Sequence, residues 1–278
     1  MKDKYQEYVN RMQELNDIGS SIGLMHWDME VMMPKMGAPR RAGQIATLSK
    51  LMHEMGTAPD LHQLMIDLNK SDLGSLTEKR NVAISLKDVE RAKKLPSDLV
   101  KELSNATSNG VHAWQEARKA NDFSIFAPHL KKIVSLKRQE AELVGFSEHP
   151  YNALLDQYEP DCTTTMLDNM FDQVKRELVP LLRSISNCKQ VDSSVMNQFF
   201  AEDAQWDFGI KVLKEMGYDM EAGRQDISAH PFTINFSAND VRVTTRVNEN
   251  DLAEMLWSCI HEGGHALYEQ GLPDSEYG

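Results

Sequence analysis

Cysteine is scarce in this 278-residue chain, and its few cysteines are poorly placed for a shared structural role. Cys162, Cys188 and Cys259 are an odd number, and no two of them form a Cys-x-x-Cys pair. This spacing argues against a disulfide framework and against a cysteine zinc site. We therefore expect a protein of a reducing compartment.

Long apolar runs and an excess of basic residues are also lacking. No stretch approaches the ~18 apolar residues of a membrane span, and the N-terminus has no apolar signal core. The chain has 30 Lys and Arg against 42 Asp and Glu, a net charge of −12, so its average surface field would repel a nucleic acid. We expect a cytoplasmic protein with no nucleic-acid partner and no membrane partner.

Apolar residues at helical spacing dominate what the sequence does contain. The i, i+3, i+4 rhythm predicts helices, and proline or glycine marks most of the breaks between them. The predicted segments are 76–94, 97–120, 129–146, 164–185 and 194–216. With no internal repeat or low-complexity linker, we expect one mainly α-helical domain over residues 1–278. A cluster of methionines near the N-terminus is predicted to fill the core: Met25, Met29, Met32, Met33 and Met36.

One stretch, 232–247, has an apolar period of two instead. Two alternating runs are separated by Ser237–Asp240, a pattern typical of a β-hairpin or of two short strands. Helical spacing then resumes, with Asn248 or Asn250 as a possible cap and with Gly271 and Pro273 as stop signals. The predicted order near the C-terminus is strand, turn, strand, helix.

That last helix carries the sequence His261–His265, in which two histidines stand four residues apart with Glu262 after the first. Residues at this spacing lie on one face of a helix, so both imidazoles can reach one metal ion. Glu262 lies at the flank of that face, where it can accept a proton from water without ligating the ion. The pattern is typical of metal-assisted peptide hydrolysis.

Gly263 and Gly264 support a functional interpretation of this helix. Each costs about 1 kcal/mol relative to alanine inside a helix, so we expect a substrate or a strand to pass close by. Two further features are open to either interpretation. His230–Phe232 opens the strand region and is most often a turn. The strand face that carries Arg242 is usually solvated, but it directly precedes the metal helix and could line a cleft.

These motifs together resemble peptidase family M32, the thermostable-carboxypeptidase type of metallocarboxypeptidase. The resemblance rests on motifs in this order: His26–Asp28, Met32–Pro34, Gly37–Arg40, Leu154–Pro160, Gly223–Phe232, Asp240–Arg246 and His261–Leu272. It implies a zincin-like helical fold with a small sheet, a homodimer, and a cytoplasmic enzyme that removes residues from peptide C-termini with zinc or cobalt. Under this resemblance His261 and His265 are metal ligands, Glu262 is the general base, and His230 and Arg242 belong to cleft motifs that bind substrate.

The sequence departs from the family pattern at the third metal ligand. In the family that ligand is a glutamate of a His-Glu-Ser-Gln motif on the next helix, and residues 1–278 contain no such motif. Glu269, one turn past His265, and Glu276, past the Pro273 turn, are the substitutes that the chain offers. We therefore expect residues 1–278 to be a partial domain that stops before the third ligand.

This departure leaves a second function open. The chain could be a catalytically silent helical interaction module, or half-protein, that binds a separately encoded C-terminal segment. The leading hypothesis remains a metallocarboxypeptidase acting on peptides.

Overall fold

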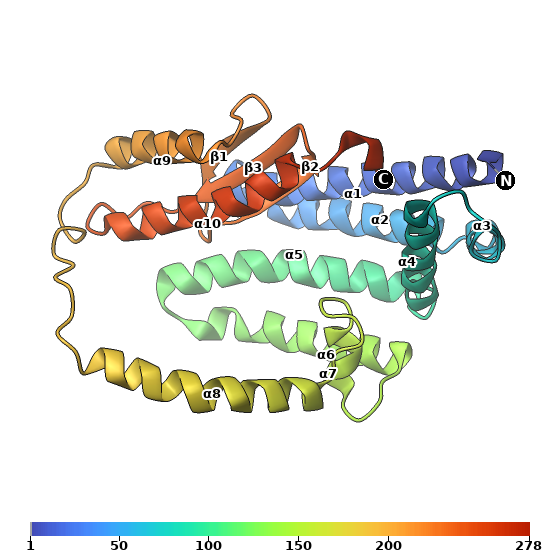
Figure 1. Cartoon of the computed structure of the whole chain (residues 1–278), viewed down its shortest axis with the longest axis horizontal. Coiled ribbons are helices and arrows are strands. Elements are labelled where there is room, and N and C mark those ends of the chain that lie inside the picture. The colour runs from blue at the N-terminus through green and yellow to red at the C-terminus, as the bar shows by residue number, and fades with distance from the viewer. Residues whose placement is uncertain (1) are drawn as a thin grey trace.

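The computed structural model describes residues 2–278, which form ten α-helices and three β-strands in the order shown in Figure 1. The helices are α1 Lys2–Val31, α2 Ala38–Gly56, α3 Pro59–Asn69, α4 Leu76–Ala92, α5 Ser97–Ala120, α6 Ala127–Val144, α7 Pro150–Leu155, α8 Thr164–Ser186, α9 Glu202–Met216 and α10 Leu252–Gln270. The strands are β1 Gly223–Ile227, β2 Thr233–Ser237 and β3 Asp240–Thr245. The mainly α fold with a small sheet is confirmed. None of the described helices combines the length and apolar character that crossing a bilayer requires.

The N-terminal half is built from helices that bury one face each. α1, α3 and α4 enclose an apolar cluster whose centre includes Leu61, Met65, Leu68 and Val82, all at most 1% exposed. α2 packs along α5, and α5 along α6. Ser75 begins α4 with a capping box, because its hydroxyl accepts the N–H of Glu78 while the Glu78 carboxylate accepts the N–H of Ser75.

The sheet has the order β1-β3-β2, with β3 parallel to β1 and antiparallel to β2. The predicted hairpin is confirmed as β2 and β3. Strand β1 was not predicted, because Gly223–Ile227 has no alternation of apolar residues that would mark a strand. Val241 and Val243 of β3 pack with Leu213 of α9 and Ala266 of α10, so α9 and α10 cover one face of the sheet.

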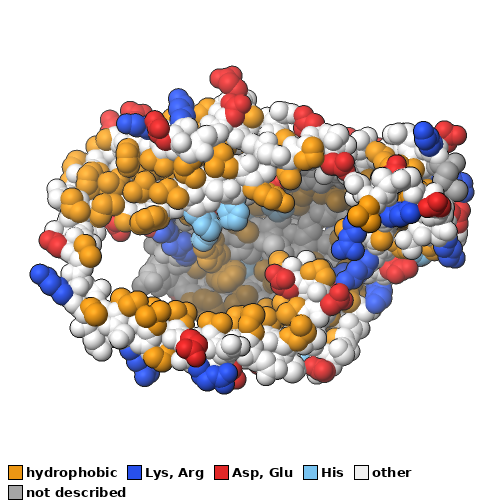
Figure 2. Space-filling model, in the orientation of Figure 1, with side chains coloured by type: hydrophobic (Ala, Val, Ile, Leu, Met, Phe, Trp, Pro, Cys, Tyr) orange, Lys and Arg blue, Asp and Glu red, His pale blue; other side chains and the backbone are white. Residues whose placement is uncertain are grey.

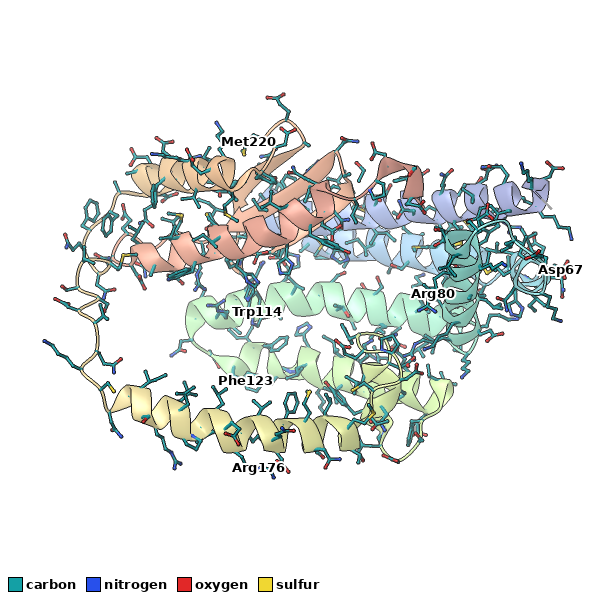
Figure 3. All side chains as sticks on the ribbon, in the orientation of Figure 1. Asp67, Arg80, Trp114, Phe123, Arg176 and Met220 are labelled. Carbon is teal, nitrogen blue, oxygen red and sulfur yellow. The ribbon has the colours of Figure 1, made fainter. Side chains whose placement is uncertain are left out.

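Helix α8 stands apart from this body. The predicted helix 164–185 is confirmed as α8 despite Pro180 in its interior, but none of its residues is buried. The chain leaves it through segment 187–201, which contains no helix or strand, and then forms α9 (Figure 1). Figure 2 shows a hollow between α8 and α10. Hydrophobic side chains lie along its α8 rim, and histidine side chains lie on its α10 rim. Arg176 lies on the other side of α8, away from the hollow (Figure 3).

Some local predictions were wrong. Helix α9 begins at Glu202 rather than near Ser194, and Asp251, not an asparagine, caps α10 by accepting the N–H of Ala253. The methionine cluster only partly fills the core. Met29 is 6% exposed, whereas Met32 is 55% and Met36 93% exposed, because both lie beside the turn between α1 and α2.

Candidate active site

Helix α10 presents two different faces. Met255, Cys259, Gly263 and Ala266 recur every three or four residues and are buried against α9 and β3. His261 and His265 lie on the exposed face of the same helix. The buried face fixes α10 on the sheet and leaves the histidine face open toward the hollow.

The two histidines lie together as their spacing predicts. Their ring centroids are 4.9 Å apart and the rings are nearly perpendicular, at 82°. Neutral imidazoles so placed on an exposed helix face fit two ligand positions of one divalent ion. Among residues 2–278 no group of three His, Cys, Asp or Glu side chains converges on a common ion position. The carboxylate of Glu269 instead accepts a hydrogen bond from Asn235 at 2.6 Å, and Glu276 lies in the terminal 3-10 turn Asp274–Glu276.

Glu262 lies between the two faces of α10 and is buried, with 7% of its surface exposed. The Thr233 hydroxyl on β2 lies 2.7 Å from the Glu262 Oε2 atom and 2.9 Å from its backbone carbonyl oxygen. A carboxylate so buried needs a donor, because removing it from water without one is costly. Strand β2 supplies that donor.

A pocket of about 320 Å³ opens beside these groups. Its lining comes from the start of β2 and from one side of α10: Pro231, Phe232, Thr233, Asn235, Glu262, His265 and Glu269. The pocket therefore brings the predicted base and one predicted metal ligand to a single concave surface. Its charged groups are the carboxylates of Glu262 and Glu269, so it is suited to a cation.

His230 precedes this lining but is not part of it. The residue is exposed, and its Nδ1 atom lies 2.7 Å from the backbone oxygen of Pro231. The path of the segment is fixed by Thr244 of β3, whose hydroxyl accepts the N–H of Phe232 at 2.9 Å and lies 2.7 Å from the Ser228 hydroxyl. Thr244 thus holds the His230–Phe232 segment against the sheet, where Phe232 reaches the pocket.

The structure does not bring Arg242 to the histidine pair. Val241 and Val243 of β3 pack toward α10, so Arg242, which alternates with them, faces the other side of the sheet. There its guanidinium lies 4.5 Å from the centroid of the Trp27 ring and donates two hydrogen bonds of 2.8 Å to Asp240. Arg242 therefore packs on Trp27 of α1 rather than beside the histidine pair.

Other motif residues also have structural partners. Trp27 of α1 lies beneath both Arg242 and Arg224, and the Asp28 carboxylate pairs with Arg41 of α2 at 2.6 Å. Burial lowers the pKa of His26 below its ordinary value, which favours a neutral ring. The segment His26–Asp28 thus joins α1 to the sheet and to α2.

The two glycines of α10 have different surroundings, and one was misinterpreted. A Cβ atom on Gly263 would lie 2.8 Å from Leu213 Cδ2 and 3.0 Å from Met216 Cε, so this glycine makes room for α9. The expectation that a substrate or a strand passes close to Gly263 is therefore wrong, because helix α9 occupies that space. A Cβ atom on Gly264 would meet nothing within 4 Å. Gly264 leaves the open face between the histidines uncrowded.

Thr233 and Asn235 are the site residues that the sequence analysis missed. The period-two run that predicted β2 also places Thr233 and Asn235 on one strand face. That signal identifies a shared face but not the helix that it meets, so it could not connect Thr233 with Glu262.

The comparisons with known proteins agree on one family. The sequence profile of the carboxypeptidase Taq (M32) metallopeptidase family matches residues 4–278. Carboxypeptidase 1 of Bacillus subtilis is 34% identical over 272 residues, which cover 97% of this chain and 54% of that protein. Thermostable carboxypeptidase 1 of Thermus thermophilus is 35% identical, over 99% of this chain and 56% of that protein.

Solved structures give the same result. The crystal structure named BsuCP superposes with a TM-score of 0.95 at 33% sequence identity, over 98% of this chain and 55% of that one. The chain thus spans about half the length of the curated relatives that it matches.

Proposed function

Because the chain belongs to the carboxypeptidase Taq (M32) metallopeptidase family, we propose that it carries part of the active site of a metal-dependent carboxypeptidase, which removes residues from the C-termini of peptides. The observation that carries the proposal is the juxtaposition on α10 and β2. Two exposed imidazoles lie 4.9 Å apart beside a pocket that also contains the buried carboxylate of Glu262.

In this proposal His261 and His265 hold the divalent ion. Such an ion, when bound, lowers the pKa of water and polarises a carbonyl group. Glu262 accepts a proton from the attacking water at its carboxylate and delivers it to the departing amine. The burial of Glu262 and its bond to Thr233 keep that carboxylate on the pocket side of α10.

The finer assignments are proposals too. Imidazole ligands suit zinc, with cobalt as an alternative. The three cysteines form no disulfide, which supports a cytoplasmic location. A homodimer and peptide substrates rest on the family resemblance. His230 is proposed to contact substrate from the edge of the pocket, since Pro231 beside it lines that pocket. The family resemblance also assigns Arg242 to substrate binding. Because its guanidinium is held by Asp240 and Trp27, we propose that it serves the site by stabilising the sheet.

The test is release of C-terminal amino acids from short peptides, followed by mass spectrometry, for the zinc-loaded wild type and for Glu262→Gln. The glutamine is similar in size but cannot accept a proton at neutral pH, so we expect release to fall by about 10²–10⁴-fold. Circular dichroism and thermal unfolding should be nearly unchanged. Full activity of Glu262→Gln would contradict the role of this carboxylate.

A second candidate function is favoured by the ligand count. Residues 2–278 bring only two ligands together, and α8 has no buried residue, so the chain could be a silent half that pairs with a separate segment. Isothermal titration with zinc distinguishes the two. Tight 1:1 binding together with peptide trimming by this chain alone would contradict the silent module, and weak binding without trimming would support it.

A further inference from the structure

Among residues 2–278, only Thr233 donates a hydrogen bond to the carboxylate of Glu262. The bond to Oε2 is 2.7 Å long, and the same hydroxyl lies 2.9 Å from the Glu262 carbonyl oxygen. Neither lysine nor arginine forms an ion pair with Glu262 in this part of the chain. The orientation of this buried carboxylate therefore depends on a single neutral hydroxyl.

The hydroxyl itself is held firmly. Thr233 is the first residue of β2 and pairs with Val243 of β3, so its backbone is fixed by the sheet. A β-branched side chain in a strand has few accessible χ1 rotamers, which limits where its hydroxyl can point. The bond to Oε2 leaves Oε1 without a protein partner among the described residues, on a side chain that lines the pocket.

From this geometry we propose that Thr233 is a positioning residue, which aims the Oε1 atom of Glu262 into the pocket. The proposal rests on the proposed function, in which Glu262 accepts the proton of water. A base whose carboxylate turns away by about 1 Å loses much of its effect, and changes of this size can cost about 10²-fold in rate. In this role Thr233 acts through its bond to Glu262.

The contact between β2 and α10 does not depend on Thr233 alone. Asn235, two residues further along the same strand face, donates to Glu269 two helical turns beyond Glu262. Loss of the Thr233 hydroxyl should therefore leave the strand in place and release only the carboxylate. A change in activity without a change in fold is what separates positioning from a structural role.

The experiment compares Thr233→Val, which removes the hydroxyl at nearly constant volume, with Thr233→Ser, which restores it. A matched control is Thr245→Val, because the buried Thr245 hydroxyl also joins a strand to α10, 2.7 Å from the Ser258 hydroxyl and away from the pocket. We expect Thr233→Val to lower kcat by about 10–100-fold with KM and zinc affinity within twofold. Thr233→Ser should recover most of kcat, and Thr245→Val should keep it.

Crystal structures of the wild type and Thr233→Val give a readout that does not need activity. We expect one Glu262 rotamer in the wild type and a displaced or second rotamer in the variant. An unchanged rotamer together with kcat within twofold of the wild type would overturn the proposal, as would an equal loss of kcat in Thr245→Val. If the wild type releases no amino acid, the proposed function fails, while the rotamer comparison still decides the role of Thr233.

Discussion

Helices α8 and α10 are both long and amphipathic, yet only one of them has its apolar face covered. α10 buries Met255, Cys259 and Ala266 against α9 and the sheet, each at most 1% exposed. α8 has the more regular apolar stripe, but its apolar residues remain about half exposed, as Phe171 at 46% and Leu178 at 45% illustrate. Amphipathic spacing therefore predicts a helix and its apolar face. It does not predict whether another helix or strand of this chain packs on that face.

The difference matters for the site. Because α10 is fixed on its buried face, its histidine face is held in one orientation relative to β2 and the pocket. α8 forms the opposite rim of the hollow (Figure 2), and none of its residues is buried. The hollow beside the site thus has one well-packed rim and one rim without a buried residue.

The largest expected effect compares one apolar residue from each helix. Met255→Ala should lower the free energy of unfolding by about 2–5 kcal/mol, because it opens a cavity at a residue with no exposed surface. Leu178→Ala should change it by less than about 0.5 kcal/mol, because its side chain is already 45% exposed and its loss leaves no enclosed cavity. Urea unfolding followed by circular dichroism measures both.

A loss above about 2 kcal/mol for Leu178→Ala would break the comparison. It would mean that the α8 face is covered in solution, and sedimentation would then reveal whether a second copy covers it. Loss of less than about 0.5 kcal/mol for Met255→Ala would contradict the packing of α10.

Much of the fold followed from local periodicity. The bounds of α5 and α8, the hairpin β2–β3 and the shared face of His261 and His265 are set by residues close in sequence, and the pattern predicted them. Strand β1 was missed because a parallel partner is chosen by tertiary pairing with β3, which leaves no alternation in Gly223–Ile227.

The features of the site that were not predicted all depend on tertiary packing, that is, on which helix covers a given face of a strand or of another helix. The alternation around Arg242 indicated that Arg242, Thr244 and Arg246 share a face, but not that α1 covers it. Arg246 forms an ion pair with Glu254 of α10 instead of facing a substrate. In the same way, two adjacent glycines indicated a close approach, and only the packed structure identifies α9 as the neighbour of Gly263.

Substitution of Gly263 or Gly264, both in α10, should change the free energy of unfolding by a smaller amount. Gly263→Ala should lower the free energy of unfolding by about 1–3 kcal/mol, since its Cβ would lie 2.8 Å from Leu213 and overpack the contact with α9. Gly264→Ala should raise it by up to about 1 kcal/mol, because alanine favours the helix and meets nothing within 4 Å. Thermal unfolding should therefore move in opposite directions for two adjacent residues. Equal shifts would show that α9 does not pack on Gly263 as described.

The smallest expected effect on stability concerns the exposed face of α10. His265→Ala should change the free energy of unfolding of the metal-free protein by less than about 0.5 kcal/mol, because the side chain is exposed. Zinc at 100 times its dissociation constant should stabilise the wild type by about 2.7 kcal/mol, since it binds only the folded state, and should not stabilise His265→Ala. Tyr268→Ala is the matched control, because it removes another exposed ring from the same helix, at 70% exposure. It should keep the stabilisation by zinc. If zinc stabilised His265→Ala as much as the wild type, the ion would bind elsewhere, and the open face of α10 would not be the metal-binding surface.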